Sequence, residues 1–249
     1  MKFAIVFFTY VNDAELLGLA LRGVERLRRL NPGDEFDVFV RDDACAPLEV
    51  VPEGVQYTQT HFNRCRNLNG LECISGMLAE YAAIFEQGDY DWLIKADCDT
   101  YINDVEWLRK HDAGLVLHVG TNHVHDYNSG ACYALSAAGV QQIRSFMGSE
   151  SVVRRVARAW CEDKAICRMA VICGNAVVMD NAANNIKAGL LYHDWKGEYA
   201  ATLEDLKLPY AVDFKRCMWH STPEAFEEDR AKAVARMAEY AAYVENELN

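Results

Sequence analysis

The first half of the chain alternates between short apolar runs and longer amphipathic segments. Residues 3–9 and 36–40 are apolar runs of strand length, and residues 54–58 are a candidate third strand. Between the first two runs, apolar side chains recur at helical spacing after Asn12 and Asp13 and stop at an Asn-Pro-Gly sequence. This order predicts a β-α-β unit at the start of the fold.

The alternation continues after a polar loop at residues 61–69. A helix is expected over 71–85, and the apolar run 92–96 predicts a buried strand. The later elements are expected at 115–119 (strand), 127–136, 137–146 (helix), about 152–170 (helix) and, after the cap residue Thr222, in a C-terminal helix. Strands alternating with helices predict an α/β fold with a Rossmann-like, mostly parallel central sheet flanked by helices.

Composition narrows the class of protein. A chain of 249 residues that is 51% hydrophobic can bury the core of one catalytic domain. Its net charge of −12 disfavours a protein whose main partner is nucleic-acid phosphate. Nine cysteines without a C-x-x-C pair fit a reducing compartment, and no apolar stretch has the length of a signal peptide or a membrane span. We therefore expect a cytoplasmic protein with no membrane anchor.

Two aspartates directly follow the predicted strand 92–96. Because side chains alternate across a strand, Asp97 and Asp99 should leave its end on the same side. Paired carboxylates suit Mg²⁺ or Mn²⁺, these cations suit a diphosphate, and nucleotides bind at the carboxyl ends of parallel strands. The pattern predicts metal-dependent chemistry on a nucleotide.

An Asp-x-Asp pair alone is a weak signal, because about one is expected by chance in a chain of this composition. A second pair, Asp89 and Asp91, follows Gly88 in a predicted turn. A solvated cap is its simplest role. Neighbouring motifs must therefore decide which pair is functional.

Four sequence blocks, in order, resemble the GT-A fold glycosyltransferases, and most closely the fringe and core β-1,3-galactosyltransferase group. They are the aspartate pair preceded by Trp92-x-x-Lys95, the run 127–136, Cys161-Glu162-Asp163 with Ile166-Cys167, and Met218-Trp219-His220-Ser221 followed by Pro223. The resemblance implies one catalytic domain over 1–249. Its nucleotide-binding half is 1–100, its donor-sugar and acceptor half is 101–225, and 222–249 is a C-terminal helix.

The resemblance also implies a Mn²⁺ or Mg²⁺ site on the diphosphate of a nucleotide sugar, a UDP-sugar. Asp99 would be a direct ligand, Asp97 a second ligand, and His220 would complete the site. Cys98 stands where the family often has a third acidic residue. The cation would stabilise the negative charge that develops on the departing diphosphate.

Lys95 leaves two interpretations open. It is either a second cation for the leaving group or the partner of a neighbouring carboxylate.

Two further blocks concern the sugar and the acceptor. Asn128, Ser129 and Gly130 resemble a small-residue turn that lets the chain approach donor sugar and acceptor closely, since Gly130 has no Cβ. An ordinary turn between two apolar segments is the alternative. The resemblance makes Asp163, beside Glu162, the base of an inverting displacement. The alternative is that both carboxylates only cap the start of a helix.

The nucleoside is expected at the ends of the first two strands. Thr9 and Tyr10 stand at the end of the first strand, and Asp42 and Asp43 stand at the end of the second. Tyrosine can stack on uracil, and a carboxylate can accept from an imide N–H or a hydroxyl. Arg66, with Arg64 and Asn67, is a further candidate contact, and residues 181–197 are expected to form a mobile loop over donor and acceptor.

The sequence thus predicts a metal-dependent glycosyltransferase acting on the hydroxyl of a glycan, a protein or a modified DNA base. A phosphohydrolase of the haloacid dehalogenase type is the alternative, with Asp97 and Asp99 as its nucleophile motif and Gly174 and Asp180 as a loose later motif. That family opens its core domain with the nucleophile strand, whereas here two or three strands come first. A nucleotide-binding module without catalysis is a third interpretation.

Overall fold

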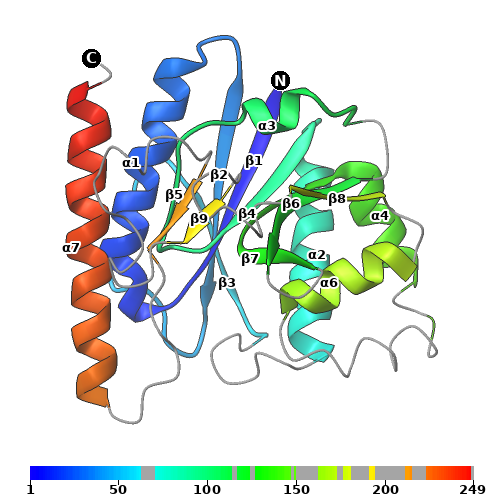
Figure 1. Ribbon diagram of the computed structural model, residues 1–249. Helices are drawn as coiled ribbons and strands as arrows, with labels where there is room; N and C mark the ends of the chain where they lie inside the picture. Colours follow the sequence, from blue (N-terminus) through cyan, green and yellow to red (C-terminus); the bar gives the residue numbers. More distant parts are fainter. Residues whose placement is uncertain are drawn as a thin grey trace.

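The computed structural model is an α/β fold built on a seven-stranded central sheet (Figure 1). The strands are ordered β3-β2-β1-β4-β7-β6-β8, and β7 alone runs antiparallel to its neighbours β4 and β6. Their bounds are β1 (Lys2–Thr9), β2 (Glu35–Asp43), β3 (Gln56–Thr60), β4 (Trp92–Ala96), β6 (Leu117–His123), β7 (Tyr127–Ser136) and β8 (Ala176–Asp180). The expectation of a mostly parallel sheet is confirmed.

The structure describes residues 1–62, 71–113, 117–123, 127–146, 149, 162–172, 176–180, 191–193, 211–214 and 223–247. Among these residues, no helix combines the length and the apolar character needed to cross a membrane.

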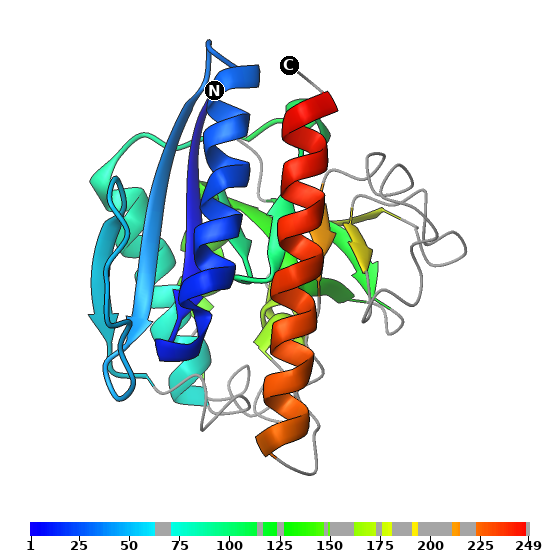
Figure 2. The same ribbon diagram turned by 90° about the vertical axis from the view of Figure 1, so that its left-hand side faces the viewer.

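Helices cover both faces of the sheet. Helices α1 and α7 lie side by side on one face, and α2, α4 and α6 pack on the other (Figures 1 and 2). The bounds are α1 (Ala14–Leu30), α2 (Leu71–Gln87), α3 (Glu106–Arg109), α4 (Ala137–Phe146), α6 (Glu162–Ile172) and α7 (Pro223–Glu247), with one 3-10 turn, η1 (Val11–Asp13), before α1.

Burial of the sheet on both faces explains the apolar runs in the sequence. In β1, Phe3, Ile5 and Phe7 join the core under α1 and α7, whereas Ala4, Val6 and Phe8 join the core under α2, α4 and α6. A strand covered on both sides needs apolar residues at every position. The run that predicted β1 is therefore continuous instead of alternating.

A second, three-stranded sheet joins distant parts of the chain. Strand β10 (Ala211–Asp213) pairs antiparallel with β5 (Thr100–Ile102) and parallel with β9 (Leu191–His193). The ring of Tyr101 packs on α1 at Gly23, where an added Cβ would lie 3.3 Å from it, and meets Tyr240 of α7 edge-on at 5.4 Å. These aromatic contacts fix β5 against both helices.

Several expected elements agree with the structure and others are corrected. The strand 92–96, the helix 137–146 and the C-terminal helix from Pro223 are confirmed. Strand β2 continues three residues beyond the expected 36–40, because Arg41 and Asp42 pair with both β1 and β3 and Asp43 pairs with β3. The expected loop 181–197 contains β9, which three residues could not signal by periodicity. Asp13 occupies the N-cap position of α1, but its side chain makes no capping hydrogen bond.

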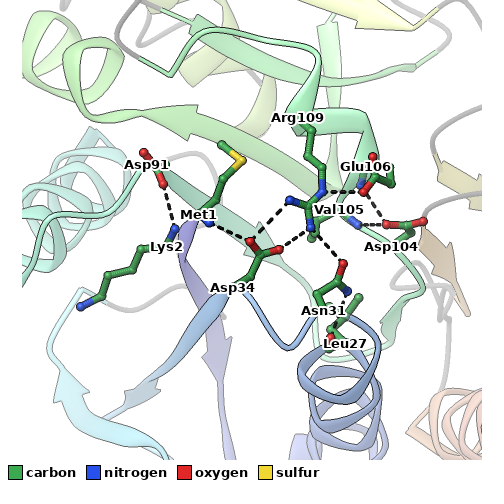
Figure 3. A network of polar contacts seen from close by, with 10 residues as sticks. All are labelled: Met1, Lys2, Leu27, Asn31, Asp34, Asp91, Asp104, Val105, Glu106 and Arg109. Atoms are coloured by element: carbon green, nitrogen blue, oxygen red, sulfur yellow. Dashed lines mark hydrogen bonds and ion pairs between the residues drawn. The ribbon is translucent and has the colours of Figure 1, made fainter.

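A polar network ties together the edge of the sheet where the parallel strands begin (Figure 3). Asp34, just before β2, accepts hydrogen bonds from the Met1 α-amino group and from Arg109 of α3. Arg109 also donates to Asn31 at the end of α1, over 2.9 Å. Burial alone would raise the pKa of Asp34, but the hydrogen bonds from the Met1 ammonium and from Arg109 outweigh burial and lower it.

Arg109→Met should lower the free energy of unfolding by about 1–2 kcal/mol at pH 7, because Asp34 loses a charged donor. A carboxylate with a lowered pKa stabilises the fold fully above its ordinary pKa of about 4, and this contribution is lost as the pH falls through the folded-state pKa. The difference between the variant and the wild type should therefore shrink below about pH 3, as measured by urea unfolding at both pH values.

Arg144→Met is the matched control for this variant. It removes an arginine whose ion pair with Glu86 is more than half exposed on both sides, so unfolding should change little. An Arg109→Met difference that stays constant with pH would show that Asp34 is not its partner in solution.

Candidate active site

The order of the strands creates a switch point between β1 and β4. Strand β1 has β2 on one side and β4 on the other. Helix α1 leaves the carboxyl end of β1 along one face of the sheet, and α2 follows the carboxyl end of β3 along the opposite face. In open α/β sheets, ligands bind outside the carboxyl ends of the strands at such a point. On one side of this switch point stand Thr9 and Tyr10, at the end of β1, and on the other side stands the aspartate pair, after β4.

The aspartate pair lies in a tight turn. Strand β4 ends at Ala96, and the Thr100 N–H donates to the Asp97 carbonyl over 3.0 Å. Asp97 and Asp99 are therefore not part of an extended strand, so strand alternation does not decide where their carboxylates point. Their expected position on the same side stays a prediction. Asp99 is 6% exposed, so the turn holds it at the boundary of the core.

The middle residue of the motif faces inward. Cys98 is buried in the core under α1 and α7, and its thiol donates to the Phe8 carbonyl over 3.6 Å. This contact joins the aspartate turn to β1 across the switch point. A side chain at this position is packed into the core and is not placed as a third acidic ligand.

Lys95 pairs with the first aspartate. Its ammonium donates to Asp97 Oδ1 over 2.5 Å, and Lys95 is fully buried while the Asp97 side chain is 30% exposed. Of the two interpretations of this lysine, the structure supports pairing with a neighbouring carboxylate.

Hydrogen bonds to backbone groups of Ala131, in the block 127–136, and of Phe214, just after β10, hold the aspartate turn in place. The Ala131 carbonyl, next to Gly130, accepts from the Asp97 N–H over 2.9 Å and from the Thr100 hydroxyl over 3.1 Å. The Phe214 N–H donates to the Asp99 carbonyl over 2.8 Å. These backbone groups gave no sequence signal, since any residue supplies them.

His220 lies outside the described residues, as does Arg66 with Arg64 and Asn67. Their expected roles in metal and nucleotide binding stay predictions.

Asn128, Ser129 and Gly130 belong to strand β7. The expected turn is therefore wrong: Asn128 pairs with Asn122 of β6, and the register shifts between Gly120 and Asn122. Pairing with β6 extends the strand into these small residues, and bulges of this kind are common beside active sites.

Glu162 and Asp163 are the first two described residues of α6. This helix packs against β7, since its buried residues Ala165 and Ile166 share a core with Tyr133. The side chains of Glu162 and Asp163 lie outside the described part of the structure. The role of Asp163 as base and the helix-cap alternative both stay predictions.

Asp42 has a structural role at the end of β2. Its fully buried carboxylate accepts from the Thr9 hydroxyl (2.8 Å), the Tyr57 hydroxyl (2.7 Å) and the N–H groups of Asp43 (3.1 Å) and Leu48 (2.7 Å). A carboxylate has about four acceptor sites, so these four donors saturate it. Asp42 therefore positions the loop after β2. Sequence reasoning missed Tyr57, whose pKa is raised by burial and by this hydrogen bond.

The loop that Asp42 organises carries the remaining nucleoside candidates. Asp43 Oδ1 accepts from the Cys45 N–H over 2.9 Å, and the Val11 N–H, next to Tyr10, donates to the Ala46 carbonyl over 2.7 Å. The segments after β1 and β2 are thus tied together. Tyr10 and Asp43 remain predicted nucleoside contacts.

The two Asp-x-Asp pairs lie at opposite edges of the sheet. Asp91 precedes β4, where its carboxylate accepts the Lys2 N–H over 2.8 Å (Figure 3). This is a structural contact at the amino end of β1. Only Asp97 and Asp99 lie at the edge where ligands bind in this class of fold.

The dehalogenase-type alternative fits this arrangement poorly. Three strands precede the aspartate strand, and Asp180 ends β8, which is separated from β4 by β7 and β6.

Carboxylate oxygens suit Mg²⁺ and Mn²⁺, so Asp97 and Asp99 fit such a cation by their chemistry. Within the described ranges, no three His, Cys, Asp or Glu side chains come together as a metal site.

No family model and no curated protein sequence matches the chain. Solved structures match its fold. The galactosyltransferase LgtC, in complex with donor and acceptor sugar analogues, has a TM-score of 0.55 and 13% identity over 96% of this chain and 95% of its own. A glycosyltransferase involved in the glycosylation of the major capsid of PBCV-1 has a TM-score of 0.56 and 10% identity over 96% of this chain and 100% of its own.

Mouse xyloside xylosyltransferase 1 has a TM-score of 0.51 and 8% identity, covering 86% of this chain and 97% of its own length. At such low identities, similarity establishes the fold alone. The chain has the mostly parallel α/β fold of the GT-A glycosyltransferases.

Proposed function

We propose that this chain is a glycosyltransferase that moves a sugar from a nucleotide-sugar donor, a UDP-sugar, to an acceptor hydroxyl with the help of Mn²⁺ or Mg²⁺. One observation carries the proposal: an aspartate pair stands at the carboxyl end of β4, at the switch point of a sheet whose fold is that of glycosyltransferases. The four sequence blocks that resemble the fringe and core β-1,3-galactosyltransferase group support the same assignment.

Asp99, Asp97 and His220 would hold the cation. The cation would neutralise negative charge on the departing nucleoside diphosphate. The protein fixes the aspartates through backbone hydrogen bonds, because the Asp97 N–H donates to the Ala131 carbonyl and the Asp99 carbonyl accepts from the Phe214 N–H. Such preorganisation matters because a positioned ligand needs no rearrangement during the reaction.

The acceptor side of the site would lie near β7 and the start of α6. Asp163, with Glu162 beside it, would take the proton of the acceptor hydroxyl. Asn128–Gly130 would line the part of the site that holds the donor sugar and the acceptor. A single base opposite the leaving group gives inversion at the anomeric carbon. The acceptor is a hydroxyl of a glycan, a protein or a modified nucleic-acid base.

The nucleoside would bind where the segments after β1 and β2 are tied together. The ring of Tyr10 would stack on the base, and Asp43 would accept a hydrogen bond from the base or the ribose. Asp42 and Thr9 would not contact the nucleoside but would hold the loop that carries Asp43, because the Thr9 hydroxyl donates a hydrogen bond to Asp42 over 2.8 Å.

Incubation with a panel of UDP-sugars and Mn²⁺ should release UDP slowly even without an acceptor, because water can replace the hydroxyl. Chelation of the metal with EDTA should stop the release. UDP is measured by coupled assay or chromatography. Release of inorganic phosphate from a generic phosphomonoester, with no UDP formed from any donor, would instead identify a dehalogenase-type phosphohydrolase.

A further inference from the structure

Lys95 is an unusual residue for its place in the fold. All five residues of β4, Trp92 to Ala96, are fully buried, and four of them are apolar. A lysine is almost never buried to this extent without a partner. Burying an ammonium group costs free energy, and an apolar residue would serve the stability of this strand better.

The surroundings of Lys95 connect it to the aspartate turn. Its ammonium donates to Asp97 over 2.5 Å and lies 5.9 Å from the ring centroid of Tyr133, the residue opposite it on β7. The Tyr133 hydroxyl is 2.8 Å from the Tyr81 hydroxyl of α2. A line of polar contacts therefore runs from α2 through β7 and β4 to the site.

We propose that Lys95 is a positioning residue for the aspartate pair, an inference that rests on the proposed function. The rigid, buried ammonium fixes the orientation of the Asp97 carboxylate and offsets part of the negative charge of two aspartates that are only two residues apart. Asp97 is then held ready for the cation. Carboxylates that bind metals depend on such outer hydrogen bonds for their orientation.

A direct role makes a different prediction from this positioning role. If Lys95 bound the donor diphosphate itself, its removal would weaken binding whether or not Asp97 were present. If Lys95 acts through Asp97, the effect of removing it disappears once Asp97 has been replaced. A double-mutant cycle between the two residues separates these cases.

Mn²⁺ binding in the presence of UDP, followed by the electron paramagnetic resonance signal of free Mn²⁺, is the test. Lys95→Met should raise the Mn²⁺ dissociation constant by about tenfold or more, the scale for loss of an outer-shell partner. Asp97→Asn, which also removes a ligand of the cation, should bind at least as weakly, and the double variant should match Asp97→Asn. Lys95→Gln, whose amide can still donate to Asp97, should retain most of the affinity.

Arg109→Met is the matched control, because it removes a paired cation at the opposite edge of the sheet and should leave Mn²⁺ binding unchanged. Equal affinity of Lys95→Met and the wild type would overturn the inference, as would a double variant weaker than Asp97→Asn. If Lys95→Met does not fold, the test uses Lys95→Gln instead. Mn²⁺ binding by Lys95→Gln that is as weak as that by Asp97→Asn would then overturn the inference. A wild type that binds no Mn²⁺ with UDP overturns the proposed function itself.

Discussion

Asp99→Asn should abolish metal-stimulated release of UDP from the donor while leaving the protein folded. The loss expected for removing one preorganised group that stabilises developing charge is about a hundredfold to a thousandfold. Asparagine keeps the size of the side chain and the backbone carbonyl that accepts from Phe214. The folded structure should therefore survive, as checked by thermal unfolding.

The measurement is UDP release as a function of Mn²⁺ concentration. Asp91→Asn is the matched control, because it alters the other Asp-x-Asp pair, whose carboxylate accepts the Lys2 N–H at the far edge of the sheet. This variant should keep its activity. His220→Ala should act in the same direction as Asp99→Asn. Undiminished turnover in Asp99→Asn would contradict the glycosyltransferase proposal.

The second large effect is expected from Asp163→Asn. If Asp163 takes the acceptor proton, the variant should lose about a hundredfold or more in transfer, the usual scale for a positioned general base. Binding of Mn²⁺ and UDP should stay near normal, since the donor side of the site is untouched. Rates are measured with water or a sugar acceptor, and the anomeric configuration of the released sugar is followed by NMR.

Glu162→Gln serves as the control for Asp163→Asn, because it removes the neighbouring charge at the first described turn of the same helix. A similar rate loss in both variants would indicate a shared structural role. An unchanged rate in Asp163→Asn, or a product that retains the donor's configuration, would identify this carboxylate as a helix cap.

The elements that could be predicted are those that carry their own pattern. Strand β4 is five apolar or buried residues bounded by polar ones, and α7 combines a proline in its first turn with a long apolar stripe. Strands β5, β9 and β10 have three residues each, so they form only because partners elsewhere in the chain pair with them. Sequence periodicity holds no information about such partners.

The candidate site also contains residues that could be predicted from the sequence and residues whose role could not. The aspartates could be located from sequence because they directly follow a buried strand and stand in order with three further sequence blocks. Asp42 shows the limit: a carboxylate at a strand end suggested ligand binding, but its donors come from β1, from the loop after β2 and from β3. Whether a carboxylate is saturated depends on tertiary contacts that no local pattern records.

The two helices that flank the switch point have a consequence for charge. Helices α1 and α2 both begin at the carboxyl edge of the sheet and run back along its opposite faces. The peptide dipoles of a helix align, so each first turn carries a partial positive charge that favours anions. The chain as a whole has a net charge of −12. The direction of its helices thus brings two partial positive charges to the edge of an acidic protein at which the aspartate pair stands.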